Sequence, residues 1–245
     1  MEGIFVNPRP TSGPNPLAVS TTPLQIQCRT AWPTLLFHIQ WQDAAKWHPG
    51  MIEKLYALKA GEKTNIASGV AMSAKPEEGL FESRMDLLDA PQDDCLIALK
   101  AFFQQSVAAV VSKVNGDRVP AHQLDVDVKD SWFHITNDGG FHDAHYHGGC
   151  SWCGIYYIRA GDVPDRQPTH APNGVNRFYS PIRIGAMQDD YGNDYLSANS
   201  TDVPPKDGML ILFPSFLLHS ALPYRGSVDR LVVAFNSTTK IRMED

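Results

Sequence analysis

The sequence predicts an α+β domain that is mainly β, with helices in its N-terminal part and strands in its C-terminal part. Between residues 43 and 116 apolar residues recur at helical spacing, whereas after Gly116 short apolar runs are separated by Gly, Pro, Asn and Asp. Many short strands divided by turn residues are typical of an all-β sandwich or barrel. The 245 residues suffice for one such domain with a sizeable core.

The N-terminal part begins with an arm and a short strand. Residues 1–23 contain five prolines and few charges, which predicts an extended arm. We expect residues 24–245 to form a single domain, with a helical support region at 43–116 and a β core at 117–245. The apolar stretch at 34–41 predicts its first strand.

Two helices should follow this strand. Pro49 suits the first turn of a helix that ends at Gly61. The second helix starts where Asp93 or Asp94 can cap it and ends at Asn115-Gly116. Its apolar residues, which recur every three or four positions, are Leu96, Leu99, Phe103, Val107, Val110 and Val114.

The C-terminal part should supply the strands. They are predicted at residues 123–128, 131–137, 142–147, 151–159, 208–213 and 230–236. Between residues 160 and 207 turn formers are frequent, and only 175–184 is strand-like. We therefore expect long loops there, around the mouth of a site.

Charge and hydropathy argue against several classes of protein. Lys and Arg number 21 against 27 Asp and Glu, and they form no cluster, so we expect no nucleic-acid partner. The longest apolar run, 209–218, is interrupted by Pro214 and Ser215 and is too short to span a membrane. The chain starts without a secretory pattern, and its four cysteines are too few for a disulfide framework, so we expect a cytoplasmic protein.

A histidine cluster is the most informative feature of the sequence. Four of the nine histidines, His134, His142, His145 and His147, lie within fourteen residues. In a strand, side chains two positions apart point to the same face, so His145 and His147 can converge on one ion. Imidazole suits iron, zinc, copper and nickel. The alternative is a pair of solvated or core histidines.

Three residues further along the chain fit such a site. His219 ends an apolar segment and is the natural third ligand. Arg230 opens the apolar strand RLVVAFN, where a guanidinium needs an anion and is well suited to a carboxylate. Tyr157 could donate to the same carboxylate. A structural salt bridge of Arg230 with Asp207 or Asp229 is the alternative.

These motifs, taken in order, resemble those of the Fe(II)/2-oxoglutarate-dependent oxygenases, in particular the 2OG-Fe(II) oxygenase family with an H-x-H motif. The matching segments are LFESRMDLL, HYH, CGIYYI, GMLILFPSFLLHSALP and RLVVAFN, so the resemblance spans roughly residues 35–239. It implies a double-stranded β-helix, of jelly-roll or cupin-like form, that uses Fe(II) and 2-oxoglutarate as co-substrate. The implied activity is a hydroxylase acting on a C–H bond of a small-molecule or peptide substrate.

Carried over by position, the resemblance implies that His145, His147 and His219 hold the iron. Arg230 and Tyr157 would hold the far carboxylate of 2-oxoglutarate.

Asn137 is a further candidate contact of the co-substrate, although an Asn before Asp-Gly-Gly is more often a turn former. Most of the superfamily has a carboxylate where this chain has His147. Asp143, two residues before His145, is therefore an alternative ligand. A second alternative leaves a metal position open, as in halogenating relatives.

Other functions remain as alternatives. Cys150 and Cys153 suggest structural zinc, but a spacing of three puts their sulfurs on opposite faces of a strand, which favours core residues. Gly139 before H-x-H matches the start of a cupin motif, whose following glutamate is missing. The last alternative is a β-helix protein that binds a ligand without catalysis. The sequence gives no basis for predicting the oligomeric state.

Overall fold

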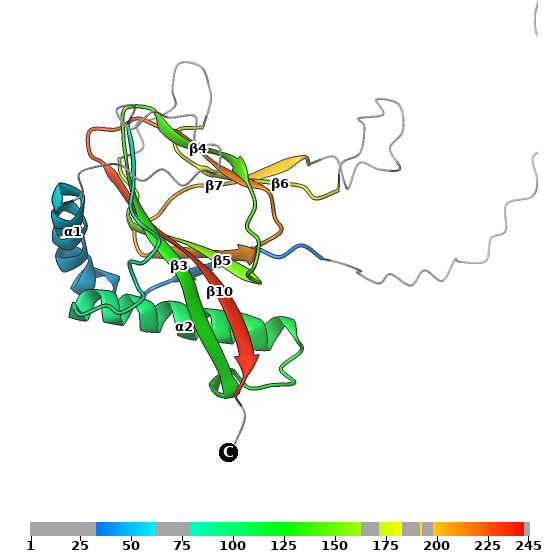
Figure 1. The fold of residues 1–245 in the computed structure, drawn as a ribbon. Helices are drawn as coiled ribbons and strands as arrows, with labels where there is room; N and C mark the ends of the chain where they lie inside the picture. Colours follow the sequence, from blue (N-terminus) through cyan, green and yellow to red (C-terminus); the bar gives the residue numbers. More distant parts are fainter. Residues whose placement is uncertain (1–32, 62–78, 163–171, 183–191, 193–197, 243–245) are drawn as a thin grey trace, which may run out of the picture. The chain divides into compact units, whose positions relative to one another are not determined.

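The computed structural model describes residues 33–61, 79–162, 172–182, 192 and 198–242. Within the compact unit Thr34–Asp245, the strands form two antiparallel sheets, and two helices cover one face of the larger sheet (Figure 1). This is the mainly β architecture with N-terminal helices that the sequence predicts. The arm predicted at residues 1–23 lies outside the described residues and stays a prediction.

The larger sheet has six strands in the order β1-β8-β5-β10-β3-β2. Their bounds are β1 Phe37–Gln40, β2 Leu80–Glu82, β3 Leu124–Thr136, β5 Trp152–Arg159, β8 Met209–Pro214 and β10 Arg230–Ile241. The smaller sheet has the order β4-β9-β6-β7. Its strands are β4 Gly140–His145, β6 Asn176–Tyr179, β7 Ser200–Val203 and β9 His219–Tyr224.

Successive side chains on β5 and β10, in the middle of the larger sheet, point alternately into two separate hydrophobic cores. On β5, Tyr156 belongs to the core under the helices, whereas Tyr157 belongs to the core between the two sheets. On β10, Leu231 and Val233 face the helices and Val232 faces the smaller sheet. Both faces of these strands are therefore buried, which is why they read as continuous apolar runs.

The helices are α1 (Ala44–Gly61), α2 (Asp94–Val114) and a short 3₁₀ turn, η1 (Ala121–Gln123). The start and end of α2 are as predicted. The predicted start of α1 at Pro49 is wrong, because the helix begins at Ala44 and contains the proline. Ala44 is buried in the core, so packing extends the helix at the cost of the hydrogen bond that a proline cannot donate.

Several strands differ from the sequence prediction, which missed β2 and placed β4 two residues too late. Residues 123–128 and 131–137 form one strand, β3, whose pairing with β10 skips Asp130 in a β-bulge. β7 lies within residues 160–207, where only loops were expected outside 175–184. β9 was not predicted, because its sequence HSALPY is mixed in polarity and contains Pro223.

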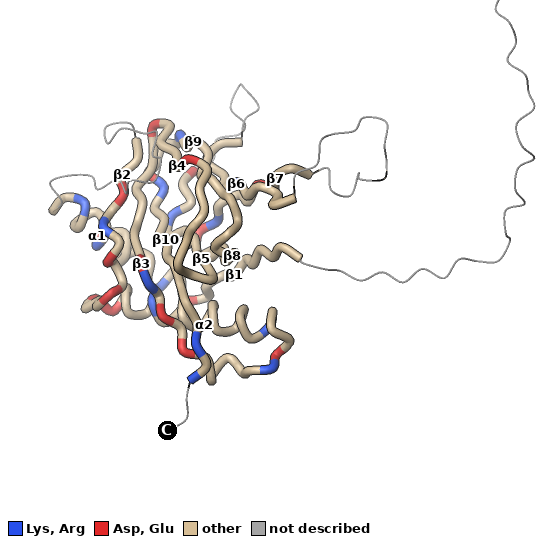
Figure 2. The backbone as a smooth tube through the Cα atoms, turned by 45° about the vertical axis from the view of Figure 1, so that its right-hand side comes forward, with Lys and Arg blue, Asp and Glu red and all other residues tan. Residues whose placement is uncertain are grey.

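The helix α2 is the one described helix that is long and apolar enough to cross a membrane by length and composition alone. Leu99, Phe103 and Val107 on its apolar stripe are fully buried in the core under the sheet. Figure 2 shows Lys and Arg interspersed with Asp and Glu along the described elements. The expected absence of a membrane or nucleic-acid partner stays a prediction.

Candidate active site

A cavity between the two sheets collects most of the predicted site residues. Its lining includes His145, His147, His219, Tyr157 and Arg230. The candidate ligand atoms of the three histidines all lie within 4.8 Å of one another. The structure thus brings together the residues that the resemblance assigned to a metal ion and to a carboxylate.

Strand pairing places the three imidazoles. His145 at the end of β4 and His219 at the start of β9 are direct cross-strand partners, and their ring centroids are 4.3 Å apart. His147 follows β4 in a loop, where its backbone N–H donates to the Ser215 carbonyl at 3.0 Å. This bond holds the loop against the turn that precedes His219.

Hydrogen bonds orient two of the rings. Nδ1 of His219 donates to the Leu217 carbonyl at 2.9 Å, and Nδ1 of His145 donates to the Asp143 carbonyl at 2.7 Å. A neutral imidazole carries one ring proton, so Nε2 of both residues keeps its lone pair for a metal ion.

Burial keeps the three imidazoles neutral. It lowers the pKa of His145 to about 3 and that of His147 to about 4, and the neighbouring His142 adds to both shifts. The pKa of the more deeply buried His219 lies well below its usual range, again chiefly through burial. The neutral imidazole is the form that binds a metal ion.

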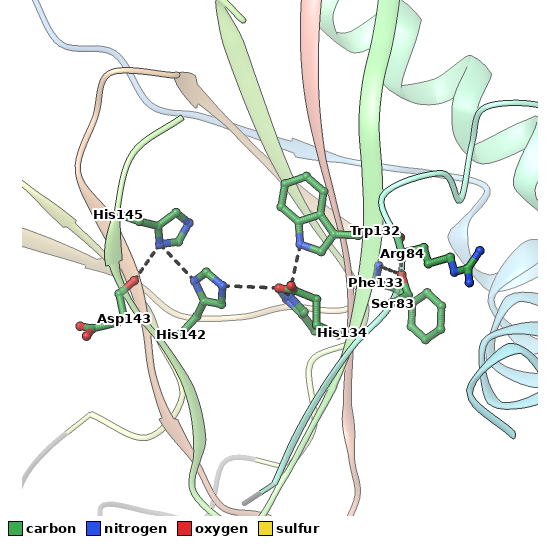
Figure 3. Close-up of polar contacts among 9 residues, drawn as sticks. Ser83, Arg84, Trp132, Phe133, His134, His142, Asp143 and His145 are labelled. Atoms are coloured by element: carbon green, nitrogen blue, oxygen red, sulfur yellow. Dashed lines mark hydrogen bonds and ion pairs between the residues drawn. The ribbon is translucent and has the colours of Figure 1, made fainter. Parts of the chain in front are cut away.

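The structure does not bring Asp143 into this cluster. Pairing of β4 with β9 shifts register between His142 and His145, which inserts an extra residue and ends the simple alternation of sides. Asp143 is exposed, accepts a hydrogen bond from the Ala144 N–H at 2.8 Å, and its side chain points away from His145 (Figure 3). His147 lies in the cluster instead, so the open-position alternative has no support in the geometry.

Arg230 is buried and lines the same cavity as the three histidines. Its Nε donates to the Ala160 carbonyl at 2.8 Å, and its Nη1 donates to the Gly174 carbonyl. Its Nη2 is buried and has no hydrogen-bond partner among the described residues. The guanidinium lies over the Tyr224 ring, 4.1 Å from the centroid. Burial lowers the pKa of Arg230, since water does not reach the charge.

The two carboxylates proposed as salt-bridge partners of Arg230 are engaged elsewhere. Asp207 accepts a hydrogen bond from the Ala160 N–H at 2.6 Å. Asp229 accepts one from the Tyr56 hydroxyl at 2.7 Å and one from Asn137 at 3.1 Å. The buried positive charge and its free donor at the cavity therefore fit an anionic ligand.

Of the two other predicted co-substrate contacts, the structure brings only Tyr157 to the cavity. The hydroxyl of Tyr157 donates to Oδ1 of Asn176, which also lines it. Asn137 does not line the cavity, because its side chain bonds Asp229 and accepts from the Asp138 and Gly226 N–H groups. Its role is that of the turn former that the sequence offered as the alternative.

Sequence reasoning missed several lining residues. Asn176 and Tyr224 come from β6 and β9, and nothing in their sequence neighbourhood marks them as site residues. Glu82, which sequence reasoning also missed, forms a second group with His134 and His142. Glu82 and His142 are buried and His134 is half-buried, and their candidate ligand atoms lie within 4.8 Å of one another. Figure 3 shows His142 between His145 and His134, with Trp132 beside His134.

Cys150 and Cys153 take no part in either histidine group. The predicted separation of their sulfurs is wrong: the two Sγ atoms are 3.7 Å apart, because Cys150 precedes β5 and the alternation of a strand does not reach it. Cys153 is buried in the core between the sheets, with Cys150 packed against it. Both are thus core thiols, as the sequence favoured.

Comparison with known proteins shows which family the site-bearing part of the chain is similar to. Residues 130–236 match the family model described as "Putative 2OG-Fe(II) oxygenase". Over these residues the chain is similar to the 2OG-Fe(II) oxygenases. The matched residues contain the three clustered histidines, Tyr157 and Arg230. A search of curated protein sequences found no match.

Solved structures show the same fold at low sequence identity. A prolyl-4-hydroxylase from Pseudomonas putida has a TM-score of 0.55 at 15% identity, over 86% of this chain and 94% of its own. A prolyl hydroxylase from Trichoplax adhaerens, in complex with a hypoxia inducible factor peptide fragment, has a TM-score of 0.53 at 14% identity, over 83% of each chain. The epimerase SnoN, in complex with Fe³⁺, alpha ketoglutarate and nogalamycin RO, has a TM-score of 0.55 at 12% identity, over 86% of this chain and 82% of its own.

The fold and cofactor predictions are confirmed by these findings. The chain has the jelly-roll core of these structures, and the family that its residues 130–236 match uses Fe(II) and 2-oxoglutarate. Its own residues fit both groups, since neutral imidazoles suit a divalent ion and the unpartnered Nη2 of Arg230 suits a carboxylate. The cupin, halogenase-like and non-catalytic alternatives are not favoured.

Proposed function

We propose that this oxygenase hydroxylates a C–H bond of a small-molecule or peptide substrate. In this proposal His145, His147 and His219 hold Fe(II), and Arg230 holds the far carboxylate of 2-oxoglutarate. The Tyr157 hydroxyl, which donates to Asn176 in the structure, turns to donate to the same carboxylate. The observation that carries it is the buried guanidinium of Arg230, which presents an unpartnered N–H group to the cavity that the three imidazoles also line.

The chain's residues contribute geometry and charge. The three imidazoles would hold Fe(II) and leave ligand positions for 2-oxoglutarate and O₂, as in other oxygen-activating iron sites. When bound, Fe(II) and 2-oxoglutarate supply the oxidising power, with O₂ consumed and succinate and CO₂ released. Arg230 fixes which end of 2-oxoglutarate faces the metal, because a buried guanidinium holds a carboxylate through charge-assisted hydrogen bonds. Buried Tyr157, beside Arg230, and buried Phe213, beside His219, help to keep water out of the cavity.

The substrate class rests on weaker support. The titles of the structural neighbours include a peptide fragment for the Trichoplax enzyme and a natural product, nogalamycin RO, for SnoN. Trp132, Phe141 and Leu222 give the cavity an apolar wall, which suits an organic substrate with apolar surface. A cytoplasmic location is part of the proposal, supported by the free thiols of Cys95, Cys150 and Cys153.

Metal analysis of purified variants tests the ligand set. The parent protein, reconstituted anaerobically with Fe(II), should hold one iron per chain and, once O₂ is admitted, should form succinate from 2-oxoglutarate. His147→Ala and His219→Ala should lose most of the iron, whereas His122→Ala, at an exposed position in η1, should keep it. Full iron content in both ligand variants would refute the assignment.

A further inference from the structure

We infer that Glu82 and His142 form a hydrogen-bonded chain that orients His145, so that both act as positioning residues for the metal. The inference rests on the proposed function, since it takes His145 as a ligand of Fe(II). Glu82 ends β2, whereas His142 and His145 belong to β4. The β-bulge in β4 turns both histidines toward the cavity, which both line.

The first link joins His145 to His142. Their Nδ1 atoms are 3.1 Å apart, and Nδ1 of His145 also lies 2.7 Å from the Asp143 carbonyl. A carbonyl can only accept, so Nδ1 of His145 carries the ring proton. Two N–H groups cannot face each other at 3.1 Å. Nδ1 of His142 is therefore an acceptor, and it shares the proton of His145 with the carbonyl.

The second link joins His142 to Glu82. Because Nδ1 of neutral His142 is an acceptor, the ring proton resides on Nε2. That Nε2 is buried, makes no hydrogen bond among the described residues, and lies 3.5 Å from Oε2 of Glu82. Both side chains are at least nine-tenths buried, with exposed fractions of 9% and 1%. A slight rotation of the ring brings this donor into hydrogen-bond range of the carboxylate.

The third contact anchors Glu82 itself. Nε2 of His134 lies 2.8 Å from the same carboxylate oxygen, and the two residues are direct cross-strand partners on β2 and β3. The position of the carboxylate is thus set by the larger sheet, whereas His142 and His145 belong to the smaller one. The chain Glu82–His142–His145 connects the two sheets at the proposed metal centre.

A second metal ion held by Glu82, His134 and His142 is the competing interpretation, since their candidate ligand atoms lie within 4.8 Å of one another. The proton positions argue against it. A metal ion on Nε2 of His142 moves the ring proton to Nδ1, where it meets the N–H of His145 across 3.1 Å. The observed contacts therefore favour a hydrogen-bonded chain.

Such a chain affects metal affinity through His145. A partner that accepts the Nδ1 proton of a ligating histidine fixes the ring and makes Nε2 a better donor to the metal, and its loss typically weakens metal binding about 10- to 100-fold. We expect His142→Phe to weaken metal binding about tenfold, the lower end of this range, because the Asp143 carbonyl remains as an acceptor for the Nδ1 proton of His145. Glu82→Gln should weaken binding less, since it removes only the charge behind His142.

Anaerobic titration with Co(II), a redox-stable probe for Fe(II), tests the inference in the full chain. The measured quantities are the dissociation constant, the number of ions bound, the Co(II) visible spectrum and the melting temperature of the metal-free protein. The variants are Glu82→Gln, His142→Phe and their combination, with His38→Phe, at an exposed position on β1, as the matched control.

The inference expects one ion per chain and weaker binding in both single variants, with a shifted Co(II) spectrum. The double variant should bind no more weakly than His142→Phe, because residues in one chain do not act additively. Additive losses, or unchanged affinity in folded variants, would overturn it. A second bound ion that Glu82→Gln removes would overturn it in favour of a dinuclear site. Retention of Co(II) by His219→Ala instead contradicts the proposed function.

Discussion

The Gly174 backbone lies directly against the guanidinium of Arg230. The Gly174 carbonyl accepts a hydrogen bond from Nη1 of Arg230, and a Cβ at Gly174 would overlap that guanidinium. Gly174 also has a φ of +62°, in the left-handed region that favours glycine. A loop residue that the sequence left unmarked thus fixes the candidate anion-binding group.

Gly174→Ala should therefore lower both stability and affinity for 2-oxoglutarate. Backbone strain of this kind costs about 1–3 kcal/mol, measurable by urea denaturation. The added methyl group also displaces Arg230, which should raise the KM for 2-oxoglutarate. Gly116→Ala is the matched control, because Gly116 has a φ of +71° and a Cβ added there would meet nothing within 4 Å. Gly116→Ala should lower stability without raising the KM for 2-oxoglutarate. Equal KM values in the two variants would contradict the role of Gly174.

Arg230→Gln should raise the 2-oxoglutarate requirement by an order of magnitude or more. A charge-assisted hydrogen bond contributes about 1.5–3 kcal/mol, and about 1.4 kcal/mol corresponds to tenfold. Succinate formation at varied 2-oxoglutarate measures this requirement, and iron content should be nearly unchanged.

Arg159→Gln serves as the control for that variant. Arg159 also lies on a central strand, but it donates to the Asp229 carbonyl at 2.7 Å and to the Tyr56 hydroxyl at 2.7 Å, and it does not line the cavity. A lower melting temperature with unchanged 2-oxoglutarate affinity in Arg230→Gln would mean that this arginine serves the fold.

Asp143→Asn should leave the metal content of the protein unchanged. The β-bulge turns this side chain to the outside, and its carboxylate bonds only the neighbouring Ala144 N–H among the described residues. The test measures the iron content of Asp143→Asn and of His147→Ala in parallel. Loss of iron from Asp143→Asn but not from His147→Ala would reverse the assignment of the third ligand.

The double variant Cys150→Ser, Cys153→Ser should also keep its metal. The two thiols contact each other, and Cys153 contacts Asn236 at 3.3 Å, but neither belongs to a group of candidate ligands. Metal analysis with a melting curve checks this. A structural zinc site would instead lose its ion and with it much of the fold.

The site could be predicted from the sequence where local periodicity holds. Counting by twos was enough for Arg230 and Tyr157, because both side chains reach the cavity even though the pairing of β10 with β5 shifts register between Leu231 and Val232. The distant His219 was predicted as the third ligand because it ends an apolar segment, and the family resemblance agreed. Its cross-strand pairing with His145 depends on β9, which the sequence did not reveal.

Prediction failed where one residue is added to a strand or where a contact is distant in sequence. The bulge between His142 and His145 reverses the expected side of Asp143, and no residue type in HDAH marks it. Glu82 reaches His142 only because β2 joins the edge of the larger sheet. Three-residue strands such as β2 are too short to show any periodicity.

The most direct test of the account is anaerobic addition of 2-oxoglutarate to the Fe(II)-loaded protein, followed by visible spectroscopy. Bidentate chelation of the keto acid at iron gives a metal-to-ligand charge-transfer band. The account predicts this band in the parent protein, its loss with the iron in His219→Ala, and its appearance only at higher 2-oxoglutarate in Arg230→Gln. A parent protein that holds iron but shows no band at saturating 2-oxoglutarate would contradict it.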